Sequence, residues 1–475
     1  MSVAALVLST LALAATPERF AVIVGVNTPI SEGVSELAFA DDDAVLTERL
    51  LRGAGIDTAL FVHLDDDSKT LFAKAPVQAE PKRDAVLAAF DRAFEGLARA
   101  KAEGRPTELY FFYSGHGDVE DGEGFVALAD GRLSRTDLFE EILARSPADK
   151  NHVVIDACRS YFLVFPKGPG GRRAPHSLDV MSPDQFPNTG FVLSTSSDRD
   201  SHEWSRFRAG VFSHEVRSAL YGGADIDRDG TISYAELGAF ITVANGAIPN
   251  PRFRPDAIVR APKVDDDARA SAMFAWPASD RVRVDVPPEA SLGHVYLEDA
   301  VGVRLADAHP SDGETLRLYA PASRPLFLRG VRVRREYAIE GESPLVLAMN
   351  DAQDATVSEK GAVHLAFREL FGEPVTAADV DAFAAQQRIE VTVPRANNAW
   401  TVRSVAPWVA GGGAVAGVGL WLGAAAVRSA AEDGTGAERE RANSQVSAMQ
   451  TGAVVGLSVA VVAAATWAVL ELLEE

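Results

Sequence analysis

The sequence has little cysteine and a shortage of positive charge. Cys158 is the only cysteine among 475 residues, so the chain forms no internal disulfide and no zinc site built on several cysteines. Lysine and arginine number 46 against 67 aspartate and glutamate residues, which gives a formal net charge of -21. Such a chain has no general attraction for nucleic acid or for an anionic membrane surface. A functional Cys158 would act as a single thiol, and the alternative is a buried structural cysteine.

Long uncharged runs are absent from most of the chain and occur only near its two ends. Residues 1–15 are almost wholly apolar and close with small residues before Thr16, which predicts a signal peptide. No basic residue precedes the run, so a wrongly assigned start codon and an ordinary apolar terminus stay open as alternatives.

Near the other end, residues 405–427 and 451–470 are uncharged and long enough to cross a hydrocarbon core of about 30 Å. They predict a transmembrane helical hairpin; the alternative is a pair of buried helices. The segment between them carries Arg428, Arg439 and Arg441, whereas the tail has no cation, which favours a cytoplasmic loop. We therefore expect a membrane protein whose large N-terminal part lies outside the cytoplasm, in the periplasm. The opposite, cytoplasm-facing orientation is the alternative.

From Phe20 onward, short β-branched and aromatic runs alternate with longer helical patterns. This rhythm predicts an α/β fold with a mostly parallel sheet flanked by helices. The predicted strands are Phe20–Val26, Ala59–Leu64, Thr107–Tyr113, His152–Asp156 and Phe191–Ser194. The predicted helices are Asp42–Arg52, Arg83–Lys101 and Arg135–Arg145.

Two of these strands end beside residues that can carry chemistry. His116 lies in Ser-Gly-His-Gly after the third strand, and Cys158 lies in Asp-Ala-Cys-Arg after the fourth. Ligands bind at the carboxyl ends of strands in open parallel sheets. We therefore expect the imidazole and the thiol to face one crevice.

These two motifs resemble the catalytic motifs of the caspase-like (peptidase C14) superfamily. Animal caspases carry Gln-Ala-Cys, whereas this chain has Asp156 at the first position, which points to the bacterial metacaspase or orthocaspase-like branch. The resemblance covers about residues 18–262. It includes the acidic segment around Asp43 and the Gly-Val-Phe-Ser-His-Glu segment from Gly210.

The resemblance implies a cysteine endopeptidase with Cys158 as nucleophile and His116 as its proton-transfer partner. It implies that the backbone N–H groups of Gly117 and Cys158 bind the oxyanion. It also places three residues in the pocket for the P1 side chain, which precedes the cleaved bond: Asp43, Ser114 and Asp156. The expected substrates are peptides or proteins cleaved after Arg or Lys. For Asp43, a helix-capping role is the alternative.

Residues 165–188 are rich in Gly and Pro and contain Arg172 and Arg173. Self-processing there would fit a basic specificity, and a merely solvated loop is the alternative.

Residues 225–236 fit the EF-hand loop pattern, with Gly230 at the sharp turn. The expected Ca²⁺ ligands are Asp225, Asp227, Asp229, the Thr231 carbonyl, Ser233 and Glu236. An acidic turn without a metal is the alternative. No organic cofactor is expected.

The region that follows alternates polar and apolar positions with frequent Pro and Gly. It predicts a β-rich, sandwich-like domain at about 270–355 and a helical segment at 360–390. The leading hypothesis is a membrane-anchored, calcium-linked cysteine endopeptidase. Its alternative is a catalytically silent, membrane-tethered calcium-binding interaction protein with the same fold.

Overall fold

The structure of the protein is a computed structural model. It describes residues 16–29, 35–120, 122–165, 182–195, 203–204, 209–246, 256–264, 271–277, 281–321, 325–331, 333, 335–340, 344–347, 353–354, 370–391 and 446. The chain divides into two compact units, Met1–Arg388 and Ile389–Glu475. The functional site and the contacts described below belong to the first unit.

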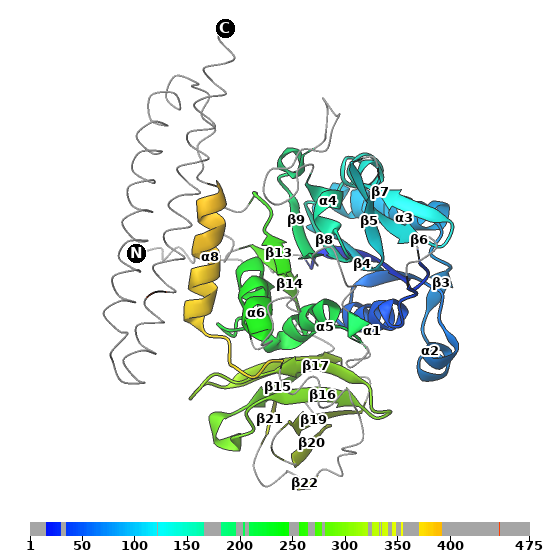
Figure 1. The fold of residues 1–475 in the computed structure, drawn as a ribbon. Helices are drawn as coiled ribbons and strands as arrows, with labels where there is room; N and C mark the ends of the chain where they lie inside the picture. Colours follow the sequence, from blue (N-terminus) through cyan, green and yellow to red (C-terminus); the bar gives the residue numbers. More distant parts are fainter. Residues whose placement is uncertain are drawn as a thin grey trace, which may run out of the picture. The chain divides into compact units, whose positions relative to one another are not determined.

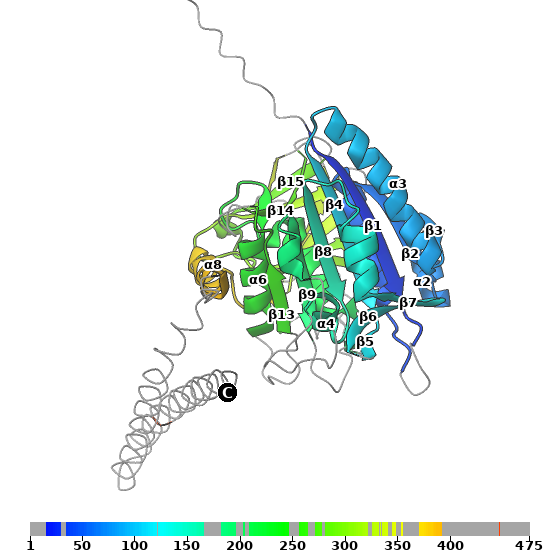
Figure 2. The same ribbon diagram turned by 90° about the horizontal axis from the view of Figure 1, so that it is seen from above.

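A seven-stranded sheet forms the centre of the N-terminal part (Figures 1 and 2). Its spatial order is β13-β9-β8-β4-β1-β2-β3. All neighbours run parallel except β13, which lies antiparallel to β9. The strands are β1 (Glu18–Val26), β2 (Asp57–Val62), β3 (Val77–Ala79), β4 (Thr107–Gly115), β8 (Lys150–Asp156), β9 (Thr189–Thr195) and β13 (Asp256–Arg260).

Helices cover both faces of this sheet because successive strand residues point to opposite sides. In β1, Ala21 and Ile23 belong to the core on one side, whereas Val22 and Val24 belong to the core on the other. The first core is shared with α1 (Ala40–Gly53), α5 (Val211–Ser218) and α6 (Tyr234–Gly246). The second is shared with α3 (Arg83–Ala102), α4 (Ser160–Val164) and the π-helix η1 (Asp137–Leu143). The buried runs are therefore apolar at nearly every position.

Smaller elements surround this framework. An antiparallel sheet consists of β5 (Gly117–Glu120), β6 (Glu123–Leu128) and β7 (Gly131–Ser134). Two-stranded sheets join β10 (Glu203–Trp204) to β11 (Ala209–Gly210) and β12 (Thr231–Ser233) to β14 (Ala272–Ala275). Short helical segments are α2 (Asp66–Leu71), η2 (Pro183–Gln185), η3 (Ala219–Gly223) and η5 (Pro288–Ala290).

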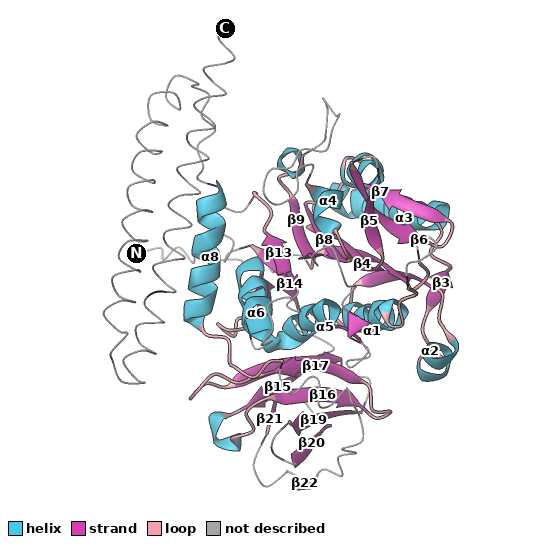
Figure 3. Cartoon of the chain, viewed as in Figure 1, coloured by secondary structure: helices cyan, strands magenta, loops and turns pink. Residues whose placement is uncertain are grey.

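Two further sheets form the β-rich region (Figure 3). One has the order β18-β15-β21 and the other β17-β16-β19-β20-β22. Their strands are β15 (Arg281–Val286), β16 (Val295–Asp299), β17 (Arg304–Ala308), β18 (Leu316–Pro321), β19 (Leu326–Gly330), β20 (Arg335–Ile339), β21 (Leu345–Val346) and β22 (Gln353–Asp354). Apolar side chains of these strands continue the core under α1 and α5, so the two regions share one hydrophobic cluster.

The predicted α/β fold class is confirmed in its central, largely parallel sheet with flanking helices. Some local predictions differ from the structure. The helix expected at 135–145 is a shorter π-helix. In the β-rich region, β15 pairs antiparallel with β18 and parallel with β21. Within the predicted helical segment at 360–390, the structure describes α8 (Ala377–Val391).

Other predictions concern parts of the chain that the structure does not describe. These are the signal peptide at 1–15 and the membrane spans at 405–427 and 451–470. Within the described ranges, no helix combines the length and the apolarity needed to cross a membrane.

Candidate active site

Strands β4 and β8 are neighbours in the central sheet, and each leads to one residue of the expected dyad. Their parallel register pairs Ser114 with Asp156. His116 and Cys158 each follow two residues later in the sequence. Neighbouring strands lie about 5 Å apart. His116 and Cys158 therefore both follow the carboxyl ends of adjacent strands, at the same end of the sheet.

Gly117 brings the two loops into direct backbone contact. A Cβ atom added at this position would lie 2.4 Å from the carbonyl oxygen of Cys158 and 3.0 Å from Cβ of Ala157. No larger residue fits without displacing the chain around Cys158. The glycine is thus required by close approach, and its amide lies beside the loop of the expected nucleophile.

The imidazole of His116 is held in a largely dry environment. Only 5% of the residue is exposed. Burial lowers the pKa of His116 below its usual 6.5, and hydrogen bonds with the backbone carbonyl groups of Ser35 and Asn27 oppose this shift. The ring is therefore neutral at pH 7. Bonding at one ring nitrogen leaves the other for proton transfer.

Cys158 is partly exposed in the turn between β8 and α4. The next residue, Arg159, takes a left-handed conformation with φ of 55°. Its Nη1 lies 2.7 Å from Oδ1 of Asp118, which follows Gly117 in β5. This ion pair ties the segment after His116 to the segment after Cys158.

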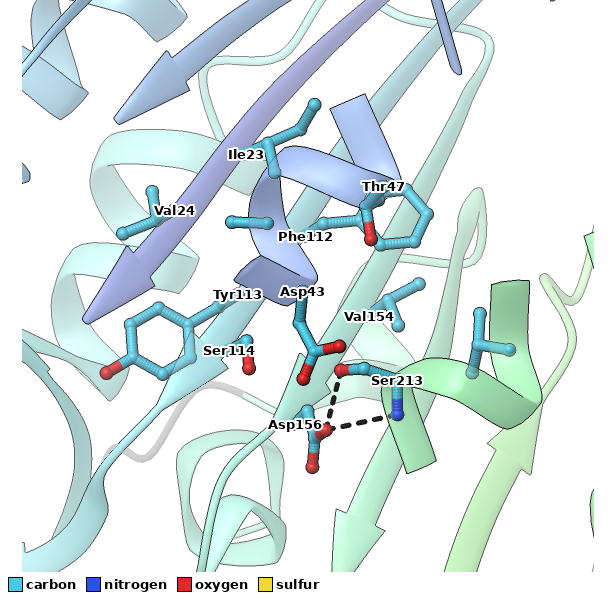
Figure 4. Close-up of a pocket in the computed structure, with 12 residues that line it drawn as sticks. Ile23, Val24, Asp43, Thr47, Phe112, Tyr113, Ser114, Val154, Asp156 and Ser213 are labelled. Carbon is cyan, nitrogen blue, oxygen red and sulfur yellow. Dashed lines mark hydrogen bonds between the residues drawn. The ribbon is translucent and has the colours of Figure 1, made fainter. Parts of the chain in front are cut away.

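A pocket lies at the carboxyl ends of β1, β4 and β8, and we call it the acidic pocket (Figure 4). It is lined by Ile23, Val24, Asp43, Ala44, Thr47, Phe112, Tyr113, Ser114, Val154, Asp156, Ser213 and Val216. The structure thus brings together the three residues expected to surround the P1 side chain, Asp43, Ser114 and Asp156. Its walls are apolar, so charge inside it is poorly hydrated.

Asp156 is the more accessible of the two pocket carboxylates. It is partly exposed, and its Oδ2 accepts hydrogen bonds from the N–H (3.1 Å) and the Oγ–H (2.6 Å) of Ser213. Figure 4 shows this pair beside the carboxyl group of Asp43. Burial raises the pKa of Asp156, and the bonds with Ser213 oppose the rise.

Asp43 is buried, and it contacts α5 rather than capping its own helix. Its Oδ2 accepts a 2.8 Å hydrogen bond from the N–H of Gly210, and its Oδ1 lies 2.8 Å from Nη1 of Arg217. The N-cap residue of α1, Phe39, makes no side-chain hydrogen bond, and the N–H groups of Ala40 and Asp41 donate instead to Oδ1 of Asn27. Burial raises the pKa of Asp43 to about 7, Arg217 opposes the rise, and Asp156 adds to it.

The structure brings together only part of the expected calcium site. Carboxylate oxygens of Asp225, Asp227 and Asp229 lie within 4.8 Å of one another. Glu236 is not in this group; its Oε2 accepts hydrogen bonds from the N–H and Oγ–H of Ser233. The Thr231–Ser233 stretch forms β12 and pairs with β14.

Three carboxylates within 4.8 Å of one another suit a divalent cation. The donor set therefore fits calcium at its N-terminal half.

Sequence reasoning missed several residues that surround the expected site. Ser213 and Arg217 bind the two pocket acids, and the carbonyl groups of Asn27 and Ser35 contact His116. The segment from Gly210 was recognised only as part of the resemblance. The two arginines of the expected processing site, Arg172 and Arg173, lie outside the described residues.

Residues 18–236 match the family model described as the caspase domain. The match covers less than half of the chain and supports placing this part in the caspase-like superfamily, a group of cysteine peptidases. It does not single out a branch of that superfamily. No curated protein matches the chain.

Solved structures similar to this chain include protein GSU0716 from Geobacter sulfurreducens, with 18% identity, a TM-score of 0.29, and coverage of 51% of this chain and 94% of that one. Pro-Sf-caspase-1 shows 11% identity and a TM-score of 0.31, with 52% and 88% covered. The Drosophila initiator caspase Dronc shows 9% identity and a TM-score of 0.31, with 53% and 83% covered.

Proposed function

We propose that this chain is a cysteine endopeptidase that uses Cys158 and His116 and cleaves after arginine or lysine. The observation that supports it most is the close approach at Gly117. A Cβ there would lie 2.4 Å from the Cys158 carbonyl oxygen, so the segments that carry the imidazole and the thiol touch. A purely structural cysteine needs no such contact with a histidine segment.

In the first half of the reaction, Sγ of Cys158 attacks the carbonyl carbon of the scissile bond, and the thiol proton passes to His116. The tetrahedral oxyanion accepts hydrogen bonds from the N–H groups of Gly117 and Cys158. His116 then gives its proton to the leaving amine, which leaves a thioester on Cys158.

In the second half, water attacks the thioester carbonyl while His116 takes a proton from it. The new tetrahedral species collapses, the carboxylic acid product leaves, and the proton returns to the sulfur. The lowered pKa of His116 favours the neutral imidazole, which is the form that removes protons at neutral pH.

The acidic pocket carries the specificity proposal. A cationic P1 side chain that enters apolar walls needs a carboxylate there, because an unpaired buried charge is costly. Asp156 lies two residues before Cys158 and is partly exposed, so it is placed to meet such a side chain. An acidic P1 residue would instead face like charge.

We further propose that the loop from Asp225 to Glu236 binds calcium. The residues that would hold it are the three clustered aspartates, the Thr231 carbonyl, Ser233 and Glu236. When bound, the cation would stabilise the loop between α5 and α6 by offsetting the repulsion among the acids. Burial raises the pKa of Glu236 to about 7, and its hydrogen bonds with Ser233 oppose the rise.

Membrane anchoring through residues 405–427 and 451–470, with the catalytic part in the periplasm, is part of the same proposal. It depends on the uncharged runs and on the arginines between them. Reporter fusions after Glu475 and within 428–450 should report opposite sides of the membrane. A cytoplasmic tail reporter would reverse the orientation.

The test of the peptidase proposal compares the intact chain with Cys158→Ala and His116→Ala. Fluorogenic peptides that end in Arg, Lys or Asp are supplied with calcium or with a chelator. We expect release after Arg and Lys, and a loss of at least about a thousandfold in each variant. Cys158→Ser is the matched control, because it puts a hydroxyl group, a smaller nucleophile, in the place of the thiol.

No Cys158-dependent release under any condition would favour the silent, calcium-binding alternative. Release only after Asp would contradict the assignment of the pocket while leaving the peptidase intact.

A further inference from the structure

Arg217 is a buried cation next to the acidic pocket, and the peptidase mechanism gives it no role. It belongs to α5 and is 1% exposed. Its Nη1 lies 2.8 Å from Oδ1 of Asp43 and 3.4 Å from the Asp43 carbonyl oxygen. Its Nε and Nη2 have no hydrogen-bond partner within the described part of the chain. A buried guanidinium needs a counter-ion, and Asp43 is the carboxylate that it contacts.

The two pocket carboxylates differ in how far a substrate can reach them. Asp43 is 1% exposed; its Oδ2 accepts a hydrogen bond from the N–H of Gly210, and its Oδ1 forms an ion pair with Arg217. Asp156 is partly exposed; its Oδ2 accepts hydrogen bonds from Ser213, and the side chain of Ser194 also bonds to its carboxyl group. A side chain that enters the pocket therefore reaches Asp156 before it reaches Asp43.

The carboxylates are also close enough to influence one another. A Cβ added at Gly210 would lie 2.6 Å from Oδ2 of Asp43 and 2.9 Å from Oδ2 of Asp156. Both oxygens therefore converge on the same backbone position. If no cation were nearby, one ionised carboxylate would strongly disfavour ionisation of the other.

We propose that Arg217 is a specificity-determining positioning residue, which neutralises Asp43 so that Asp156 alone meets the cationic P1 side chain. The proposal builds on the peptidase function given above. It assigns the pocket one net negative charge, which matches a single arginine or lysine. Asp43 then pairs with Arg217 and accepts the hydrogen bond from Gly210, and it does not contact the substrate.

The charges around the pocket give distinct expectations for three variants. With both acids ionised, Asp43, Asp156 and Arg217 together carry one negative charge; Glu215 of α5 is fully buried as well, and burial raises its pKa well above the usual range. Asp43→Asn leaves Arg217 unpaired and brings the pocket to zero. Asp43→Asn combined with Arg217→Met returns the net charge to that of Asp156 alone. Arg217→Met alone leaves both acids facing the P1 cation.

The experiment measures peptide binding to the full chain carrying Cys158→Ala, so that no turnover is needed. The probes are two hexapeptides that differ only in Arg or Gln at P1, and calorimetry gives each Kd. We expect the parent to prefer the Arg peptide by about tenfold or more. Asp43→Asn should lose that preference, the double variant should recover it to within about threefold, and Arg217→Met should keep or increase it. Thermal unfolding of each variant shows that it is folded.

The proposal is overturned if the double variant binds the Arg peptide with as little preference as Asp43→Asn, because the substrate would then need Asp43 itself. If Asp43→Asn fails to fold, the double variant against the parent still decides. Equal binding of both peptides by the parent also overturns it. Hydrolysis by the chain that retains Cys158 is measured separately and shows whether the peptidase proposal fails too.

In the chain that retains Cys158, the same substitutions should change KM for Arg peptides and leave kcat within about threefold. A merely structural role would lower both and would not be rescued by the second substitution.

Discussion

Two aspartates contact neighbouring faces of α5, and their surroundings differ in charge balance. On the β-rich side, Asp307 accepts hydrogen bonds from Nε2 of His214 (2.7 Å) and Nε2 of His294 (2.6 Å), and from Nε of Arg304 (2.7 Å). Arg304 in particular holds the pKa of Asp307 well below its usual range despite burial. On the pocket side, Asp43 shares one cation with Asp156, and its pKa is about 7.

This difference separates a structural charge cluster from a binding site. The carboxylate of Asp307 is fully hydrogen-bonded by side chains of the protein, so it has no need of a ligand. Its N–H also donates to Oγ of Ser218, so two positions of α5 are fixed against β17. The pocket side of the same helix presents Ser213 and Arg217 to two acids. We infer that the contacts of Asp307 fix the orientation of α5. The two pocket acids share a single cation, which leaves a net negative charge that a cationic substrate can pair with.

Asp307→Asn should give the largest loss of stability. It removes the buried carboxylate that Arg304, His214 and His294 contact, and breaking a buried ion pair costs about 3–5 kcal/mol. Urea unfolding followed by circular dichroism measures the change. Asp91→Asn is the control, because Asp91 pairs with Arg145 on the surface, where both side chains are about half exposed, and should cost about 1 kcal/mol or less. Equal losses would mean that the buried cluster around Asp307 contributes no more than an exposed ion pair.

The two sides should also respond to pH with opposite signs. Burial lowers the pKa of His214 to about 4, below the ordinary 6.5, so between these values only the unfolded chain binds the proton. Stability from this group therefore falls as pH falls from about 6.5 to 4. Asp43 has the reverse relation, because its folded pKa of about 7 exceeds the ordinary 3.8. Its protonation stabilises the folded chain as pH falls through that range.

His214→Gln should therefore reduce the loss of stability between about pH 7.5 and pH 5, by about 2 kcal/mol. Asp43→Asn combined with Arg217→Met should increase that loss. The measurement is the free energy of unfolding in urea at both pH values. Parallel behaviour of both variants and the parent would show that neither group titrates as described.

The strand framework and the expected dyad could be predicted because they depend on local patterns. Buried parallel strands are short apolar runs, and His116 and Cys158 come directly after two of them. The sequence could not show that β4 and β8 are neighbours, since strand order depends on the whole topology. The small sheet of β5, β6 and β7 was missed because β5 (Gly-Asp-Val-Glu) and β7 (Gly-Arg-Leu-Ser) each contain a single apolar side chain and so form no apolar run.

The pairing of Arg217 with Asp43 could not be predicted for a different reason. The two residues are separated by 174 positions, and no spacing rule connects them. The residues one turn before Arg217 in α5 are Ser213 and His214, so its helix face is polar and gives no local signal that the arginine is buried. In the same way, the role of His214 becomes visible only when Asp307 of the β-rich region is placed against α5.

Gly210→Ala should affect the pocket side and spare the other. The added Cβ would meet Oδ2 of both Asp43 and Asp156 at less than 3 Å, so the carboxylates must move apart. We expect KM for an Arg peptide to rise about tenfold with little change in kcat. Gly96→Ala is the matched control, because no atom outside its own helix lies within 4 Å of the added carbon. A fall in kcat alone would place Gly210 with the reacting atoms instead.

Tyr319→Phe tests whether the β-rich region also supports the acidic loop. The hydroxyl of Tyr319 donates a 2.8 Å hydrogen bond to Oδ2 of Asp225, so its removal leaves a buried carboxylate with one donor fewer. We expect a loss of about 1 kcal/mol in the free energy of unfolding with a chelator present. Tyr337→Phe is the control: Tyr337 is also 1% exposed, and its hydroxyl has no partner among the residues that the structure describes. It should cost nothing, because phenylalanine removes an unsatisfied polar group. Equal losses in the free energy of unfolding would mean that both substitutions act through packing. The hydrogen bond from Tyr319 in β18 would then contribute nothing to the stability of the loop.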